Sequence, residues 1–333
     1  MGAGDGANAA YSLRPMGSSV SSSGAQLAPA SSPGDPSVRA GLFALSAVQL
    51  CFGLFPVFGA LAMDRATGFS PFAVATWRIG VGAVVLMAMA TALFGRRALP
   101  SRGDLPTLLG FAVLGIVLNQ GLFLEGLQRS TPMNAGLVIC LIPVFTYAVA
   151  VVLGKEALRG LRVLGVAVAL GGSVPLFFSS GGDLSSEHAF GNLLMAGNAL
   201  CYAIYLVLSK PLLRRMPPLV LVAWIYVLSV PFLPFFFVGE SLVPEGVSRG
   251  AWLSLAYVLI FPTILAYALN SYALARVEAS TTAFFVFAQP IITAAAAATL
   301  LAERPTPELG LAAAGLFTGM ALVVKRPAPR PAA

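Results

Sequence analysis

Charged residues are scarce in this sequence, and histidine is almost absent. Lys, Arg, Asp and Glu make up 10% of the 333 residues, and His188 is the only histidine. A soluble globular domain carries about 25% charged residues. The low charge content excludes a soluble protein. It also leaves few groups for acid–base catalysis, so the sequence predicts no catalytic residues and no enzyme.

The cysteines indicate neither a metal site nor disulfides, and no nucleotide-binding motif is found. Cys51, Cys140 and Cys201 lie in apolar stretches, at spacings that suit neither a zinc site nor a disulfide framework. We interpret them as small core residues. No G-x-x-x-x-G-K-[ST] motif is present, which excludes ATP as a direct energy source. No metal or other cofactor is therefore expected.

Long apolar runs are what the sequence has in abundance. Hydrophobic residues make up 58% of the chain, and the mean hydropathy is +0.86. A membrane-spanning helix needs roughly 20 mainly apolar residues. Ten runs approach or meet this length, at 40–62, 71–94, 106–126, 132–153, 160–178, 190–209, 218–238, 251–272, 279–301 and 308–324. The sequence predicts an all-α integral membrane protein with ten transmembrane helices and the lipid bilayer as its partner.

The net charge of +7 reflects where Lys and Arg lie rather than binding to nucleic acid. With the N-terminus placed in the cytoplasm, fifteen Lys and Arg residues fall on the cytoplasmic side, and the outer side holds Arg65, Arg129, Arg249 and Arg304. This bias follows the positive-inside rule and predicts an inner-membrane protein with both termini cytoplasmic. Residues 1–38, rich in Ser, Gly, Ala and Pro, are expected to be a disordered cytoplasmic tail, and residues 327–333 a short one.

The chain contains an internal repeat. Residues 102–172 align without a gap to residues 249–319, and five distinctive matches fall 147 positions apart: Arg129 and Arg276, Pro143 and Pro290, Thr146 and Thr293, Glu156 and Glu303, Gly172 and Gly319. The offset covers five predicted helices, an odd number, so the second copy is inverted in the membrane. The halves are predicted at 39–178 and 190–326, joined by an outer loop at 179–189.

Several short motifs lie in the same order in a known family. They are Thr76-Trp77-Arg78, the stretch from Asn119-Gln120-Gly121 to Gly126-Leu127, and the acidic residues Glu156 and Glu303. This pattern resembles the EamA-type, ten-helix members of the drug/metabolite transporter superfamily. The resemblance implies two inverted five-helix repeats and export or exchange of small metabolites. Related four-helix exporters use a Glu in their first helix, whereas this chain has Gln49 there, so that proton-exchange mechanism is not carried over.

Polar side chains within the apolar runs are the candidates for binding substrate. The resemblance places a cavity between the two halves, and nine residues are predicted to line it: Gln49, Arg78, Asn119, Gln120, Tyr202, Tyr205, Tyr267, Asn270 and Gln289. Arg78 either binds a substrate carboxylate or phosphate, or has a structural role in which it binds carbonyls at a helix end or partners a polar residue. Each amide either faces the cavity or forms a hydrogen bond between helices. Arg78 and the aromatic residues, Trp224 and Tyr226 among them, suit an amino acid or a similar small molecule.

Two repeat-related pairs are candidates for moving parts. Pro143 and Pro290 each remove a helical hydrogen bond in mid-span, which predicts kinks that act as hinges or simply shape the bundle. Glu156 and Glu303 end their helices at opposite faces, in gating or structural roles. Glu125 is expected to pair with Arg129 one turn away, the alternative being a part in proton coupling.

Small residues are concentrated in the fifth and tenth predicted helices, at Gly165, Gly171, Gly172, Gly315 and Gly319. Such residues allow close approach of helices. They predict either packing within the bundle or the seam of a homodimer.

Three classes of function compete on this sequence. The first is a secondary transporter of a small metabolite, an exporter or exchanger that works by alternating access. The second is a lipid flippase or a non-transporting membrane scaffold, which the shape of a cavity would distinguish from the first. The third, a membrane enzyme, lacks an acid or base within the membrane and would need Ser173 or Ser209 to pair with one.

Overall fold

The computed structural model describes residues 36–178, 187–236, 241–274, 276 and 285–324, and all regular structure in this part of the chain is helical. Seven helices are long and apolar enough to cross a membrane, and three shorter apolar helices accompany them at Gly160–Pro175, Ala288–Leu300 and Pro307–Val323. The chain is thus a multi-pass membrane protein. The count of ten crossings and the inverted repeat stay predictions, and residues 279–284 of the predicted ninth helix lie outside the described part.

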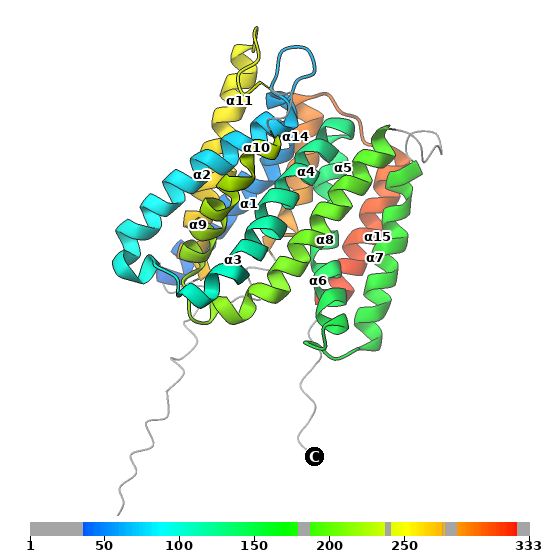
Figure 1. Cartoon of the computed structure of the whole chain (residues 1–333). Helices are drawn as coiled ribbons and strands as arrows, with labels where there is room; N and C mark the ends of the chain where they lie inside the picture. The colour runs from blue at the N-terminus through cyan, green and yellow to red at the C-terminus, as the bar shows by residue number, and fades with distance from the viewer. Residues whose placement is uncertain (1–35, 179–186, 237–240, 275, 277–284, 325–333) are drawn as a thin grey trace, which may run out of the picture.

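The helices follow one another up and down a single bundle (Figure 1). In chain order they are α1 (Pro36–Ala62), α2 (Pro71–Phe94), η1 (Gly95–Ala98), η2 (Arg102–Asp104), α3 (Leu105–Ala112), η3 (Val113–Val117), α4 (Leu118–Arg129), α5 (Pro132–Val138), α6 (Leu141–Val152), α7 (Gly160–Phe178), α8 (Glu187–Leu213), α9 (Pro218–Ser229), η4 (Val230–Phe232), α10 (Leu233–Phe236), α11 (Arg249–Ile260), η5 (Phe261–Leu265), α12 (Ala266–Leu274), α14 (Ala288–Leu300) and α15 (Pro307–Val324).

Helix starts in this bundle are encoded locally. The side chains of Ser70, Thr131 and Ser248 each accept a hydrogen bond from a backbone N–H three residues later, at the starts of α2, α5 and α11. These caps satisfy one of the backbone donors that a first turn leaves free. Proline follows directly at positions 71 and 132, where its missing N–H is harmless.

Contacts between loops define two ends of the bundle. At the end called here the Arg65 end, Arg65 pairs with Glu187 at 2.9 Å, and the Ser248 N–H donates to the Thr67 carbonyl at 2.9 Å. At the opposite end, called the Arg215 end, Arg215 pairs with Asp104 at 2.5 Å. Both ends join segments that are far apart in sequence, so the bundle is closed into one body.

Helices α7 and α15 pack against each other along their length, at the right of Figure 1. A Cβ on Gly172 would lie 2.5 Å from Gly315 Cα, and a Cβ on Gly165 would lie 2.8 Å from the Gly319 carbonyl oxygen. The two backbones therefore touch where both residues are glycine. Of the two alternatives for these glycines, packing within the bundle is the one observed, whereas Gly171 has open space where its Cβ would be. A homodimer stays an untested prediction.

The predicted N-terminal tail and the predicted outer loop both end earlier than expected. Helix α1 begins at Pro36, so residues 36–38 are helical rather than part of the tail, and α8 begins at Glu187, so His188 lies in a first helical turn rather than in a loop. Proline at a helix start and an acidic residue in the first turn both favour these earlier beginnings. The remainder of both predicted tails and of the predicted loop, residues 1–35, 179–186 and 327–333, lies outside the described residues.

Candidate functional site

A cavity of about 630 Å³ lies within the bundle, between the two sequence halves. Ligand sites for small molecules commonly measure about 300–1,000 Å³. The lining residues come from α1, α2, α4, α6, α8, α12 and α14, with further contributions from α7 and α15. The cavity runs from Arg78 to Glu156 and Arg162, two partly exposed residues that follow α6 and begin α7. It is large enough for an amino acid or a similar metabolite.

Eight of the nine predicted substrate-binding residues line this cavity: Gln49, Arg78, Asn119, Gln120, Tyr202, Tyr267, Asn270 and Gln289. Tyr205 does not. Its ring packs edge-on against Phe111 at 5.6 Å, and a Cβ on Gly115 would lie 3.2 Å from it. Tyr205 therefore belongs to the core between α3 and α8, and its predicted role is corrected accordingly.

Arg78 is buried at the closed end of the cavity, with 5% of its surface exposed. Its Nε donates a hydrogen bond to Thr263 Oγ1 at 2.9 Å, and its guanidinium carbon lies 4.2 Å from the centre of the Phe55 ring. Within the residues that the structure describes, no carboxylate forms an ion pair with Arg78. A buried cation in this environment is costly unless an anion or a dipole compensates it.

Amide side chains around the cavity connect helices from different parts of the chain. Gln289 Nε2 donates to Gln49 Oε1 at 2.7 Å, which joins α14 to α1. Asn198 Nδ2 donates to the Asn119 carbonyl at 2.7 Å, which joins α8 to α4. These amides therefore form hydrogen bonds between helices and border the cavity at the same time.

The predicted proline kinks are present at equivalent positions. The helix is interrupted at residues 139–140, four and three residues before Pro143, and again at residues 286–287 before Pro290. Proline cannot donate to the carbonyl four residues earlier, which explains both interruptions. Ile139, Pro143 and Val286 line the cavity, whereas Pro290 does not. Whether the kinks act as hinges stays a prediction.

The two repeat-related glutamates have different surroundings. Glu156 lines the cavity and pairs with Arg162 at 2.8 Å, with Lys210 at 4.0 Å. Glu303 lies away from the cavity at the Arg65 end, where its Oε2 accepts the Met133 N–H at 3.3 Å in the first turn of α5. Glu303 thereby links the segment that follows α14 to the first turn of α5, whereas Glu156 lies at the opposite end of the cavity. Glu125 pairs with Arg129 as predicted.

Glu303 provides a prediction on pH and stability. Burial raises the pKa of this carboxyl, and hydrogen bonds from Thr131 and Met133 only partly oppose the rise. A raised pKa in the folded state means that ionisation at neutral pH lowers stability, and that this loss disappears as pH falls. We therefore expect Glu303→Gln to unfold at a higher temperature than wild type at pH 7, with the difference vanishing in acid.

Thermal unfolding in detergent, followed across pH, measures this effect. Glu308→Gln is the control, because Glu308 lies in the first turn of α15, where a carboxylate is favourable, so its replacement should not raise the unfolding temperature. A Glu303→Gln protein that is less stable than wild type at pH 7 would contradict the prediction.

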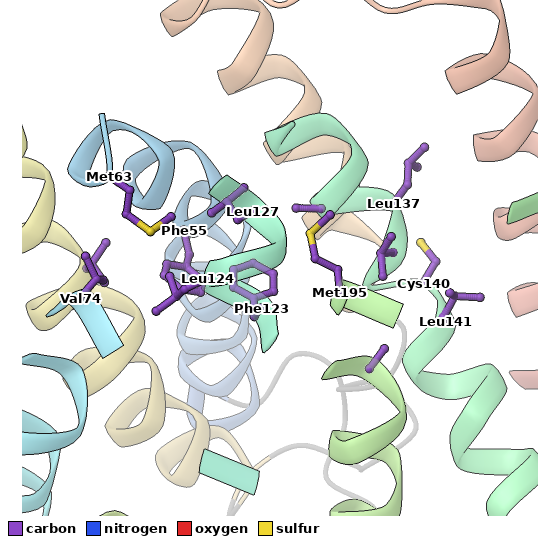
Figure 2. Close-up of a cluster of buried hydrophobic side chains, with 14 of the residues drawn as sticks. Phe55, Met63, Val74, Phe123, Leu124, Leu127, Leu137, Cys140, Leu141 and Met195 are labelled. Atoms are coloured by element: carbon purple, nitrogen blue, oxygen red, sulfur yellow. The ribbon is translucent and has the colours of Figure 1, made fainter. Parts of the chain in front are cut away.

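Aromatic and aliphatic side chains close the cavity toward the Arg65 end. The rings of Phe55 and Phe123 stack with centres 5.1 Å apart, and Leu124 and Leu127 lie beside them on α4 (Figure 2). A second stack, of Phe58 on Tyr257 with centres 4.0 Å apart, joins α1 to α11. This end is sealed by apolar packing, so Arg78 lies at the bottom of a pocket.

Sequence reasoning missed Thr263 and Arg162. Thr263 is fully buried beside Arg78, and the only local signal was the preceding Pro262. Arg162 was expected to be a surface charge, yet it borders the cavity. Trp224 does not line the cavity. Its Nε1 instead donates to the Ala98 carbonyl at 2.6 Å.

The two serines considered for enzymatic chemistry, Ser173 and Ser209, form hydrogen bonds to the main chain. Their hydroxyls donate to the main-chain carbonyls of Leu170 and Leu206, at 2.8 and 3.3 Å. In the part of the chain that the structure describes, neither hydroxyl pairs with an acidic or basic side chain.

The fold and sequence of this chain are similar to those of known proteins. A solved crystal structure superposes with a TM-score of 0.59 at 20% sequence identity, over 85% of this chain and 96% of the other, which shows a shared fold. Similar curated proteins include an uncharacterized transporter of Archaeoglobus fulgidus, 29% identical over 71% of this chain and 81% of that protein, and the uncharacterized transporter YyaM of Bacillus subtilis, 25% identical over 68% and 75%.

A third relative is a probable terminal-alkyne amino-acid exporter of Streptantibioticus cattleyicolor, 25% identical over 75% of this chain and 82% of that protein. The model of the EamA-like transporter family matches residues 39–178 and 189–325. These ranges cover most of the chain and include the helices that form the cavity. The chain therefore belongs to the EamA-like transporter family.

Proposed function

We propose that this protein is a secondary transporter that moves a small metabolite, an amino acid or a similar molecule, across the inner membrane. It acts as an exporter or exchanger. The observation that carries the proposal is the cavity of about 630 Å³ with buried Arg78 at its closed end. The probable amino-acid exporter among the relatives supports this substrate class.

Alternating access about this cavity is the proposed mechanism. Ten helices in two inverted repeats, 39–178 and 190–326, rock about the central site. The equivalent helix interruptions before Pro143 and Pro290 support this arrangement. With the Arg215 end in the cytoplasm, as the positive-inside rule favours, the cavity opens inward and the stacked rings of Phe55 and Phe123 close it from outside.

Counterflow in proteoliposomes tests the proposal. Purified protein is reconstituted, loaded with a pooled set of amino acids and small organic acids, and assayed for accelerated uptake of the labelled compounds. Exchange of one compound class supports transport. No exchange by folded protein would contradict it and favour a lipid flippase or a scaffold, which lipid scrambling in the same vesicles would distinguish.

Gln289→Ala is expected to slow this exchange by about tenfold, since one interhelical hydrogen bond and one cavity polar group are lost together. Thr299→Ala is the control on the same helix, because Thr299 is exposed and donates only to backbone carbonyls of its own helix. Equal exchange rates for wild type and Gln289→Ala would remove Gln289 from the binding site.

A further inference from the structure

The cavity is bordered by a distorted turn in the helix that contains Thr263. Residues Phe261–Leu265 form a π-helical turn between α11 and α12. Pro262 has no N–H, so the carbonyl of Val258, four residues earlier, loses its ordinary helical partner. The hydroxyl of Thr263 replaces that partner, since its Oγ1 donates to the Val258 carbonyl at 2.8 Å. The only proton of this hydroxyl is therefore used in the hydrogen bond to Val258 and cannot be donated elsewhere.

The same oxygen accepts a hydrogen bond from Arg78. A hydroxyl has one proton and two lone pairs, so Thr263 Oγ1 can only accept once its proton is given to Val258. Arg78 Nε donates to it at 2.9 Å, and the Phe55 ring lies 4.2 Å from the guanidinium carbon. The guanidinium is thus fixed at its inner nitrogen and on one face.

Close packing beneath Arg78 adds to this restraint. Gly82 lies one helical turn after Arg78, and a Cβ there would lie 2.5 Å from the Tyr226 ring and 3.3 Å from the Thr263 methyl group. Tyr226 is fully buried, so it fills this space. The two terminal nitrogens of Arg78 have no hydrogen-bond or ion-pair partner among the described residues, and Arg78 lines the cavity.

The other half of the chain shows that a π-helical turn can form without a threonine that bonds an arginine. A π-helical turn also occurs at Val113–Val117, one residue before the repeat equivalent of Phe261–Leu265, and Ile116 corresponds to Thr263. The turn therefore forms without a threonine. Residues 225–228, which lie 147–150 positions after Arg78, are Ile-Tyr-Val-Leu and include no cation. The arginine and its hydroxyl partner occur together, and only in one half.

We propose that Thr263 is a positioning residue that directs the two terminal nitrogens of Arg78 into the cavity as a site for the carboxylate of an organic acid or amino acid. The inference rests on the proposed function. A planar carboxylate matches a guanidinium fork with two parallel hydrogen bonds. One unpaired cation suits a monoanion, because the other lining cation, Arg162, already pairs with Glu156.

Binding of matched carboxylates and amides tests this proposal. Benzoate, 3-phenylpropanoate and L-phenylalanine are compared with benzamide, 3-phenylpropanamide and L-phenylalaninamide, through their effect on thermal unfolding of the purified protein. We expect wild type to bind at least one carboxylate about tenfold or more tightly than its amide, since hydrogen bonds to charged groups are the stronger ones. Thr263→Val is expected to lose that preference, with affinity for the amide unchanged.

Three further variants keep the test specific. Thr263→Ser retains the hydroxyl and is expected to stay within about threefold of wild type, because the positioning hydrogen bond is retained. Thr76→Val is the matched control, since Thr76 is a buried threonine whose hydroxyl has no partner in the described structure. In an Arg78→Lys background, Thr263→Val is expected to have no further effect, as coupled residues are not additive.

The outcomes separate this inference from the proposed function. Equal losses for carboxylate and amide in Thr263→Val, or an undiminished effect in the Arg78→Lys background, would make Thr263 purely structural and overturn the inference. A wild type that prefers none of the three carboxylates would also overturn it, while exchange of another compound class in proteoliposomes would leave the transport proposal standing. If folded protein exchanges no compound at all, both the inference on Thr263 and the proposed transport function are contradicted.

Discussion

Replacing Arg78 with glutamine is expected to reduce counterflow of the best wild-type compound by about a hundredfold, because a charge-assisted, two-pronged contact is lost from a buried site. The rate at low substrate concentration in proteoliposomes measures the effect. Arg78→Lys keeps the charge but not the fork, and is expected to be intermediate. Arg102→Gln is the control, since Arg102 is exposed and outside the cavity.

The thermal stability of Arg78→Gln distinguishes a substrate-binding role of Arg78 from a purely structural one. A charge in the middle of a membrane helix costs about 2.5–3.5 kcal/mol on insertion scales. If Arg78 serves substrate, its removal relieves this cost, and Arg78→Gln should unfold at the same temperature as wild type or higher. If Arg78 is only a structural link to Thr263, the variant should be less stable but should still exchange substrate when folded. Undiminished exchange by a less stable variant would thus argue against the binding role.

Gly315→Val is expected to be the most destabilising substitution in the bundle. A Cβ at Gly315 would meet the Gly172 backbone, and a Cβ on Gly172 would lie 2.5 Å from Gly315 Cα. Backbone cannot move aside as a side chain can. We therefore expect the free energy of unfolding to fall by about 3 kcal/mol or more, at or above the upper end of the 1–3 kcal/mol usual for overpacking. The yield of monodisperse protein and its unfolding temperature measure this loss.

Gly310 offers a matched control on the same helix, because a Cβ there would have nothing within 4 Å. Gly310→Ala removes a flexible residue from a helix and should be neutral or slightly stabilising. Similar stability of Gly315→Val and Gly310→Ala would show that α7 and α15 do not touch through their glycines. A change of oligomeric state in Gly315→Val would instead favour the dimer seam.

Features with a local cause were the ones that sequence predicted. Proline at positions 143 and 290 removes a hydrogen bond within its own helix, and both interruptions occur where that bond is missing. The helical membrane class follows from composition alone, and the placement of eight polar residues at the cavity follows from the position of the apolar runs. The family resemblance supplied the position of the cavity itself.

Features that depend on the rotation of one helix against another were not predictable. Helix α8 is apolar on most sides, so no polar face separates Tyr202, which lines the cavity, from Tyr205, which packs behind it. Thr263 is an unremarkable threonine in sequence, and its role depends on Arg78, 185 residues away. Contacts of this kind exist only once the helices are packed.

The paired π-helical turns also bear on how such chains diverge. A π-turn holds one residue more than the α-helix it interrupts, and Asn119 and Gln120 follow the turn at Val113–Val117 just as Tyr267 and Asn270 follow the turn at Phe261–Leu265. Because the wider turn absorbs this extra residue, deleting it would restore regular pitch and leave the following half-helix facing nearly the same way. The same side chains would still face the cavity. Each turn is thus a place where this scaffold can change its length by one residue without exchanging its lining.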